Sequence, residues 1–217
     1  MVVVETIKHG YNLVMKNKII FVPLLLLTII SGPLGFLILV GHTLGFEFVL
    51  FIIASILASI LVRLMTINLC FAAVKSRKKI SLQSSFSMAT KKFLTLLGAS
   101  LLYFAIVFGG ILLLVIPGIY LAIRFSYYPY AILIDNKKAF ESLTKSWKAT
   151  KGRWWITFFT GLIVGLFTLI IIAPFYALGF FYPRTLSLFS IFISLISIFF
   201  EAWGIANFTI LYLKFKK

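Results

Sequence analysis

The amino-acid sequence predicts an all-α polytopic membrane protein, a single integral membrane domain over residues 1–217 with six transmembrane helices. Three observations support this prediction. Hydrophobic residues make up 62% of the chain and charged residues only 12%, whereas a soluble domain is about half apolar and a quarter charged. Apolar runs of about 20 residues, long enough to cross a hydrocarbon layer about 30 Å thick, recur along the whole length. The 21 lysines and arginines lie mostly in short clusters between these runs.

Six apolar runs are the predicted spans. They cover residues 19–40, 47–74, 93–115, 118–134, 154–178 and 187–212. We expect the first span to bend near Gly32-Pro33, because proline lacks the amide donor of a helical hydrogen bond. The third and fourth spans are expected to form a hairpin with a tight turn at Pro117-Gly118.

Three amphipathic segments precede or separate these spans, at residues 3–15, 81–91 and 137–150. Each segment places apolar residues on one helical face and lysines elsewhere, which predicts an interfacial helix at the membrane surface. Ser81 is the expected N-cap of the second segment, and Asp135 or Asn136 caps the third, because these side chains accept hydrogen bonds from the first helical turn.

The amphipathic segments share a short pattern, which indicates an internal repeat. The sequences IKHGY, LQSSF and LTKSW each have an aliphatic residue, two variable positions, a small residue and an aromatic residue. A long span follows each of them, so we predict a three-fold repeat of an interfacial helix plus a hairpin of two spans. The predicted units are residues 1–74, 75–135 and 136–217. An odd number of repeats in one orientation differs from the inverted pairs common in transporters.

The basic residues predict the orientation of the chain in the membrane. Of the 21 lysines and arginines, all but Arg63, Arg124 and Arg184 fall in segments on the side of the N-terminus. The positive-inside rule then places both termini in the cytoplasm, with the spans in the cell membrane. The N-terminal segment contains Glu5 and no cleavage site of small residues, so we interpret it as retained. A lone cysteine, Cys70, and a composition rich in Ile, Lys and Phe indicate a prokaryotic chain without a disulfide framework.

The sequence argues against nucleic-acid binding and catalysis. The net charge of +16 arises from the clusters between spans, and no aromatic-basic platform or recognition helix accompanies it. His9 and His42 are predicted on opposite faces of the membrane, so they cannot share a metal. No two of the five acidic residues lie in one loop, and no phosphate-binding glycine loop or nucleophile elbow occurs. We therefore predict no enzymatic activity, no metal and no cofactor.

The sequence IPGIYLAIRF, followed by AILIDNKKAFESLTKSWKATKGRWW, resembles the membrane domain found beside glycerophosphodiester phosphodiesterases. It is also similar to the YciC-like inner-membrane proteins. The matching positions are Pro117, Gly118, Arg124, Ala139, Ser142, Leu143, Ser146, Trp147, Thr150 and Gly152. The resemblance implies a helical membrane architecture. Where that membrane domain is fused to a phosphodiesterase barrel, the chemistry belongs to the barrel, and we expect no such barrel in these residues.

Three charged residues lie inside apolar spans. Arg63, Arg124 and Glu201 occupy the second, fourth and sixth spans, each about ten residues from the cytoplasmic end and therefore about 15 Å deep. A charge at this depth costs about 3 kcal/mol on insertion scales and normally faces another charge or a wet cavity. We predict that Glu201 pairs with Arg63, Arg124 or both. The remaining positive charge would bind an anion; alternatively, the charges only lock the three spans together.

Stripes of small and hydroxyl residues run along the second, fifth and sixth spans. Such residues let membrane helices approach closely, so packing inside one bundle is one interpretation. A hydrated path along the stripes is a second. A protein partner or homodimer held through Gly161 and Gly165, which form a GxxxG motif, is a third.

Lysines beside aromatic residues predict contact with anionic lipid headgroups on the cytoplasmic side. The candidate residues are Lys16, Lys18, Lys78, Lys79, Lys91, Lys92, Lys145, Trp147, Lys148, Arg153 and Trp154. The sequence therefore favours a non-enzymatic, lipid-interacting membrane protein, or an accessory or scaffold to a membrane process. The alternative is a transporter or channel for a small anionic solute, with the charges inside the spans as its site.

Overall fold

The computed structural model describes residues 2–30, 45–75, 81–181 and 186–216, and these residues form an all-helical protein without a strand. Residues 18–21 form η1, a 3-10 helix, and residues 22–30 continue as an α-helix. The other elements are α1 (Val2–Lys16), α3 (Phe46–Val74), α4 (Leu82–Leu113), α5 (Val115–Phe125), α6 (Tyr128–Asp135), α7 (Ala139–Thr150), α8 (Trp154–Phe181) and α9 (Leu186–Phe215).

Among the described residues, four helices are long and apolar enough to cross a membrane: α3, α4, α8 over Trp154–Leu178 and α9 over Phe192–Phe215. They correspond to the second, third, fifth and sixth predicted spans, which confirms the helical membrane class. The helix α1 and residues 18–30 meet at 90° and count as a fifth candidate only if the bent pair is one span. The bend predicted at Gly32-Pro33 lies outside the described residues.

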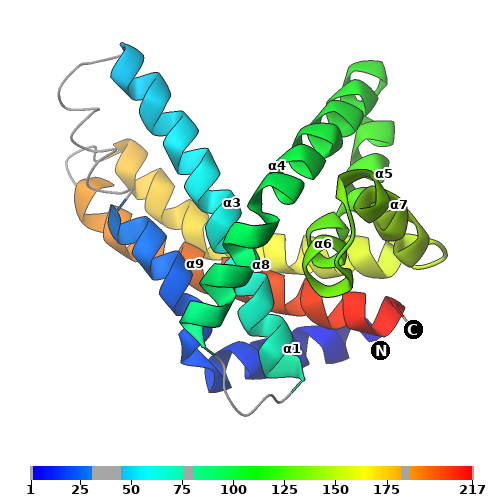
Figure 1. Cartoon of the computed structure of the whole chain (residues 1–217). Helices are drawn as coiled ribbons and strands as arrows, with labels where there is room; N and C mark the ends of the chain where they lie inside the picture. The colour runs from blue at the N-terminus through cyan, green and yellow to red at the C-terminus, as the bar shows by residue number, and fades with distance from the viewer. Residues whose placement is uncertain (1, 31–44, 76–80, 182–185, 217) are drawn as a thin grey trace.

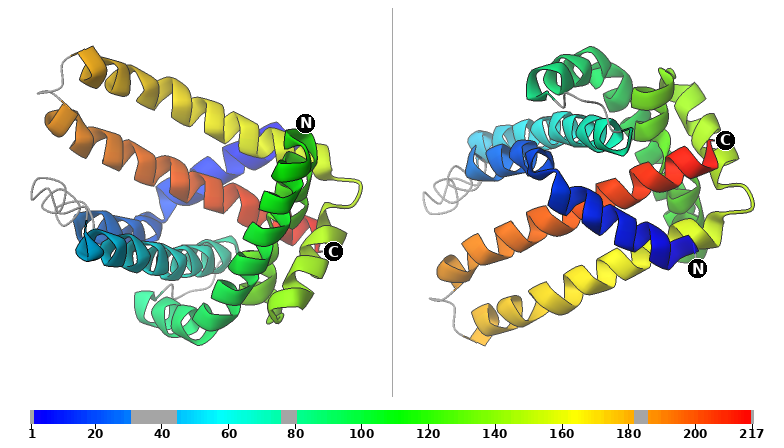
Figure 2. Two further views of the ribbon diagram at one scale, coloured as in Figure 1. Left: turned by 90° about the horizontal axis from the view of Figure 1, so that it is seen from above. Right: turned by 90° about the horizontal axis from the view of Figure 1, so that it is seen from below.

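The helices form a V above a crossed base. Figure 1 shows α3 and α4 diverging as the two arms of the V, with α5 returning beside α4. The helices α8 and α9 pack side by side, and α1 crosses α9 on the side seen from below (Figure 2). The largest buried cluster lies where α1, α3, α4, α6 and α9 meet, and it includes Val14, Leu64, Leu96, Tyr130 and Ala206. The core therefore lies at the base of the V, and the two arms extend away from it.

The helix α4 runs without interruption from Leu82 to Leu113. The prediction of a separate interfacial helix at 81–91 is therefore wrong, because that segment is the start of α4. No glycine or proline separates it from the following apolar run, so nothing ends the helix there. The Ser81 side chain accepts a hydrogen bond from the Ser84 N–H at 3.5 Å, which confirms Ser81 as the N-cap.

The hairpin between α4 and α5 turns at Leu114, and Pro117-Gly118 lies inside α5. The hairpin is confirmed, but the turn comes three residues earlier than predicted. Proline is tolerated in the first turn of a helix, where its missing N–H would have no partner. A Cβ on Gly118 would lie 2.9 Å from the backbone nitrogen of Ile111, so glycine is what lets α5 pack closely on α4.

The predicted continuous fourth span at 118–134 is wrong, because the chain breaks at Ser126 and Tyr127 between α5 and α6. Pro129 lies at the start of α6. A proline inside a helix removes one hydrogen bond and clashes with the carbonyl four residues earlier, here that of Phe125. The eleven residues of α5 and the eight of α6 are each too short to cross a membrane alone.

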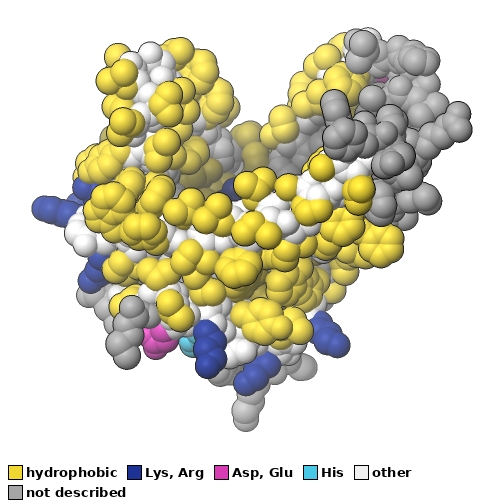
Figure 3. Space-filling model, turned by 180° about the vertical axis from the view of Figure 1, so that it is seen from behind, with side chains coloured by type: hydrophobic (Ala, Val, Ile, Leu, Met, Phe, Trp, Pro, Cys, Tyr) yellow, Lys and Arg dark blue, Asp and Glu magenta, His cyan; other side chains and the backbone are white. Residues whose placement is uncertain are grey.

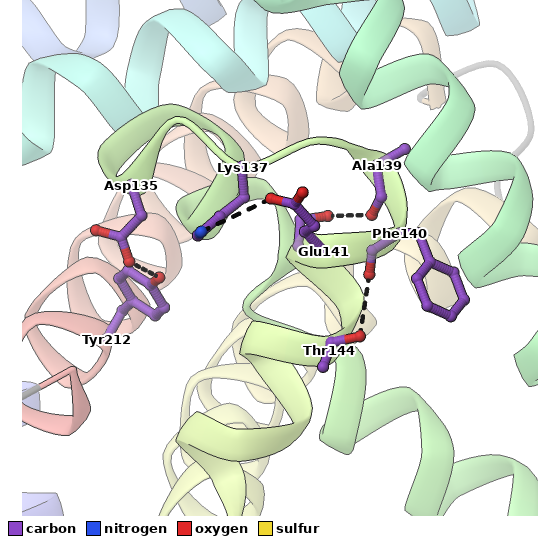
Figure 4. A network of polar contacts seen from close by, with 8 residues as sticks. Asp135, Lys137, Ala139, Phe140, Glu141, Thr144 and Tyr212 are labelled. Carbon is purple, nitrogen blue, oxygen red and sulfur yellow. Dashed lines mark hydrogen bonds and ion pairs between the residues drawn. The ribbon is translucent and has the colours of Figure 1, made fainter.

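The amphipathic helix predicted at 137–150 is confirmed as α7, although its cap differs from the prediction. Lys138 precedes α7 as the N-cap, and Asn136 instead ends α6 in a left-handed conformation with φ 55°. Asn adopts this conformation more readily than most residues. The Asp135 side chain points to Tyr212 of α9 rather than to α7 (Figure 4).

Candidate functional site

The helix α7 supplies the hydrogen bonds that the break between α5 and α6 removes. Ser146 Oγ accepts the Tyr127 N–H at 2.9 Å and lies 2.9 Å from the Arg124 carbonyl oxygen, to which it donates. Thr150 Oγ1 lies 3.2 Å from the same carbonyl. Ser146 and Thr150 are fully buried. Hydroxyl groups of neighbouring helices are what makes an interrupted helix tolerable at membrane depth.

The break also directs a group of tyrosines towards the centre of the molecule. Tyr127 is fully buried, and its hydroxyl lies 3.1 Å from Thr157 Oγ1 of α8. The Tyr128 hydroxyl lies 3.0 Å from Ser100 Oγ of α4. The Tyr130 hydroxyl donates to the Ile205 carbonyl of α9 at 3.4 Å. These contacts join α5 and α6 to three long helices.

A cavity of about 330 Å³ lies between the long helices and this break. Its lining residues come from α3, α4, the α5–α6 break with α6, and α9: Arg63, Tyr103, Ser126, Tyr128, Tyr130, Glu201, Gly204, Ile205 and Phe208. Its volume is at the small end of the range of about 300–1,000 Å³ typical of ligand pockets. The cavity therefore has space for a small polar group.

The cavity lies at the floor of the V. The arms α3 and α4 touch near their base, where Asn68 Nδ2 donates to Ser85 Oγ at 3.1 Å. Arg63 lies five residues before Asn68 on α3, and Tyr103 lies eighteen residues after Ser85 on α4, so both are further along the arms than this contact. Seen from behind, hydrophobic side chains cover one of the two lobes that flank a hollow and the part of the other lobe that is not drawn in grey, and most visible lysines and arginines lie below the lobes (Figure 3).

Arg63 and Glu201 face this cavity together, from α3 and α9. The ion pairs of 4.0 Å or less in the described part of the chain are Lys137–Glu141, Lys214–Glu5 and Lys216–Asp135. The structure thus brings Arg63 and Glu201 to one cavity but does not join them in a direct ion pair.

Arg124, the third charge of the predicted cluster, lies outside this cavity. Its guanidinium carbon is 4.5 Å from the centre of the Trp147 ring and 5.2 Å from that of Tyr120. Its Nε donates to the Tyr120 hydroxyl at 2.8 Å. Arg124 lies in the last turn of α5, which ends at Phe125, and its side chain contacts α7. The predicted cluster of three charges is therefore divided between two places.

Of the predicted headgroup-binding residues, Trp147 lies against this arginine, and Trp154 lies against Tyr120, the partner of the arginine. The Trp154 ring stacks on Tyr120, and its Nε1 donates to the Tyr120 carbonyl at 3.3 Å. Trp147, Lys145, Lys92 and Trp154 are partly buried, whereas Lys16, Lys18, Lys91, Lys148 and Arg153 are exposed. Lys78 and Lys79 lie outside the described residues, as does His42.

Gly161 of the predicted GxxxG motif faces the same chain. A Cβ at Gly161 would lie 3.5 Å from the Phe208 ring of α9, whereas a Cβ at Gly165 would meet nothing within 4 Å. Gly161 therefore contributes to the packing of α8 on α9.

The small residue of each repeated pattern contacts another helix. Gly10, Ser85 and Ser146 are all buried. A Cβ on Gly10 would lie 2.8 Å from the Asn207 Cγ atom of α9. Ser85 accepts a hydrogen bond from Asn68 of α3, and Ser146 bonds to the α5–α6 break. The pattern therefore marks three positions at which an amphipathic segment meets a neighbouring part of the chain.

A polar network that the sequence analysis missed holds the C-terminal end of α9. Asp135 Oδ2 accepts the Tyr212 hydroxyl at 2.6 Å, and its other oxygen pairs with Lys216. Lys92 of α4 donates to Asn136 beside it. Figure 4 shows this end of α6 and the neighbouring Lys137–Glu141 pair. No sequence signal marks this network, because its members lie far apart along the chain.

A family model described as "Domain of unknown function (DUF7847)" matches residues 104–202. The matched residues extend from the middle of α4, through the break, α7 and α8, to Ala202 of α9, and so include Glu201 of the cavity. No curated protein and no solved structure matches the chain. The chain is therefore similar, over these 99 residues, to a family of unknown function.

Proposed function

We propose that this protein is a non-enzymatic integral membrane protein that binds the headgroup of a membrane lipid in the cavity between α3, α4, α6 and α9. One observation carries the proposal: Arg63 and Glu201 face a small cavity at the floor of two apolar arms. In a bilayer, charged side chains at this depth need a polar occupant or each other. A lipid headgroup would supply that occupant. The opposing expectation is that water alone fills the cavity.

The arms suit the apolar part of such a lipid. Large hydrophobic side chains are exposed along α3, such as Ile53 and Ile56, and along α4, such as Leu101 and Phe104. Acyl chains lying between these arms would cover them while the headgroup reaches the polar floor. A cavity of about 330 Å³ is too small to enclose a whole phospholipid, so only the headgroup would enter it.

We test this proposal with lipids that copurify with the protein in mild detergent, detected by native mass spectrometry. Arg63→Gln should reduce bound lipid at least tenfold, because a charge-assisted hydrogen bond contributes about 1.5–3 kcal/mol and 1.4 kcal/mol is tenfold in affinity. Lys8→Gln is the matched control, since it removes an exposed cation of α1 that lies outside the cavity and outside the predicted headgroup-binding residues. Equal lipid retention by the two variants would refute the proposal.

Transport of a small anion is the second candidate, because the same cavity carries an arginine and is lined by three long helices. Anion flux into proteoliposomes separates the two functions. Flux through the wild type that a folded Arg63→Gln variant lacks would favour transport. A wild type that retains lipid and shows no flux would favour the lipid-binding function.

We also propose six crossings, with both termini in the cytoplasm of a prokaryotic cell. The first crossing would begin with the helix that follows η1, and α5 and α6 in tandem would form the fourth. Single cysteines in a Cys70→Ser background test this topology with a membrane-impermeant maleimide. A cysteine at position 43 should react on intact cells, whereas cysteines replacing the exposed Lys8 and Lys148 should react only after lysis. Reaction of either of the latter on intact cells would overturn the topology.

A three-fold repeat is part of the same proposal. Its support is that Gly10, Ser85 and Ser146, the small residues of the pattern, are each buried against a span. Leucine at each of these positions should destabilise the protein, because overpacking a close helix contact forces neighbouring backbone to move. A leucine at any one of them that leaves unfolding unchanged would argue against equivalent roles.

The basic residues around the base would add contacts to anionic lipids, each lysine near the surface contributing about 1 kcal/mol. Vesicles with increasing anionic lipid should therefore bind a soluble α7 peptide more tightly, and Lys145→Gln with Lys148→Gln should weaken this binding. Binding that does not depend on the anionic fraction would reject this contribution.

A further inference from the structure

We propose that the headgroup in this cavity is zwitterionic, with its phosphate held by Arg63 and a primary ammonium held by Glu201. This inference rests on the lipid-binding function proposed above and names its ligand class, an amine-bearing glycerophospholipid.

The two charges of the cavity are the first argument. Arg63 and Glu201 line it from different helices, and no direct ion pair joins them. A purely anionic headgroup would satisfy Arg63 and at the same time bring a negative charge towards Glu201. A headgroup with one charge of each sign satisfies both side chains and leaves no uncompensated charge inside the membrane.

The hydroxyl groups of the lining are the second argument. Ser126 donates to the Ile123 carbonyl at 2.9 Å, Tyr103 to the Ala122 carbonyl at 3.5 Å, and Tyr130 to the Ile205 carbonyl at 3.4 Å. A hydroxyl has one proton and two acceptor lone pairs. Since these protons are already used, the three oxygens are left as acceptors. A primary ammonium, which has three N–H donors and no acceptor, matches them.

The aromatic rings of the lining are the third argument. Four aromatic side chains line the cavity: Tyr103, Tyr128, Tyr130 and Phe208. The rings of Tyr103 and Tyr128 stack with centres 5.1 Å apart. A ring face attracts a cation, and a phosphate gains nothing from it. Among the lining residues, Arg63 alone carries the positive charge that a phosphate requires.

The experiment measures which lipid the purified wild-type protein retains when native mass spectra are recorded from equimolar mixtures of phosphatidylethanolamine, phosphatidylglycerol and phosphatidylcholine. We expect the ethanolamine lipid to be retained at least fivefold over either of the others. Glu201→Gln should abolish this preference and still retain phospholipid. Glu201→Lys should invert it towards the glycerol lipid, a gain that unfolding cannot produce.

Glu141→Gln is the matched control, because it removes an exposed acid of α7 that pairs only with Lys137 among the described residues. It should leave the preference unchanged. Circular dichroism and size-exclusion chromatography check that each variant is folded.

The outcomes separate this inference from the function on which it rests. A wild type that retains the glycerol or choline lipid as strongly as the ethanolamine lipid overturns the primary-ammonium site and leaves lipid binding intact. The same holds if Glu201→Gln keeps the wild-type preference. A wild type that retains no phospholipid overturns both.

Discussion

Replacing Ser146 with alanine tests how α7 holds the break between α5 and α6. The Ser146 side chain is fully buried, and its hydroxyl bonds to the Tyr127 N–H and to the Arg124 carbonyl, each at 2.9 Å. Alanine removes both bonds and leaves the helix propensity of α7 at least as high. The Arg124 carbonyl keeps the Thr150 hydroxyl at 3.2 Å. The Tyr127 amide, by contrast, loses the partner that the structure gives it.

The expected magnitude follows from this difference. A buried donor left without a partner costs about 1–3 kcal/mol. Hydrogen bonds between membrane helices average about 0.6 kcal/mol, because the unfolded chain also finds partners. The loss at Arg124 adds little, since Thr150 remains there. We therefore expect Ser146→Ala to lower the free energy of unfolding by about 1–3 kcal/mol.

Unfolding by sodium dodecyl sulfate in mixed micelles, followed by circular dichroism and tryptophan fluorescence, measures this change. Thr144→Ala is the matched control on the same helix, because Thr144 is exposed and its hydroxyl donates to the Phe140 carbonyl at 3.3 Å (Figure 4). Its effect should stay within about 0.5 kcal/mol. Equal effects of the two substitutions would show that α7 does not hold the break through Ser146.

The same unfolding measurement tests three further contacts. Gly118→Ala should destabilise the protein by about 1–3 kcal/mol, because its Cβ would lie 2.9 Å from the α4 backbone. Gly109→Ala is the control and should not destabilise it, because a Cβ there meets nothing within 4 Å. Equal effects of the two substitutions would contradict the close packing of the hairpin. Gly10→Ala should cost a similar amount, because its Cβ would strike the buried Asn207 side chain, and a neutral effect would show that α9 yields there. Asp135→Ala should lower the free energy of unfolding by about 1.5–3 kcal/mol and speed hydrogen exchange in the last turn of α9. Unchanged exchange would show that the Asp135 network does not hold the C-terminal end of α9.

Hydropathy alone was sufficient for four of the spans, because the apolar surface that a membrane helix needs is a property of about 20 consecutive residues. The same local reasoning failed at residue 92 and at Pro129. Nothing at residue 92 interrupts a helix, so the amphipathic segment and the span joined into α4. Pro129 is visible in the sequence, but a proline can bend a helix or break it. At this break Ser146, nineteen residues after Tyr127, is placed to accept the Tyr127 N–H.

The candidate site shows the same division. The position of Arg63 and Glu201 along their spans was enough to predict that they lie at a similar depth, because position within a straight helix converts directly into depth. The structure places both in the lining of one cavity. It was not enough for Arg124, whose direction depends on where α5 ends and on Tyr120 and Trp147, which meet it from α5 and α7.

The sequence by itself determined that this chain is a helical membrane protein with charges inside its spans, because composition and the length of apolar runs need no tertiary contacts. Only the tertiary structure decided which charges share a cavity, how α7 holds an interrupted helix and how Asp135 holds the end of α9. Each of these depends on side chains that are distant in the chain and meet in space. Such meetings leave no periodic pattern in the sequence, and their hydrogen-bond geometry exists only once the helices have packed.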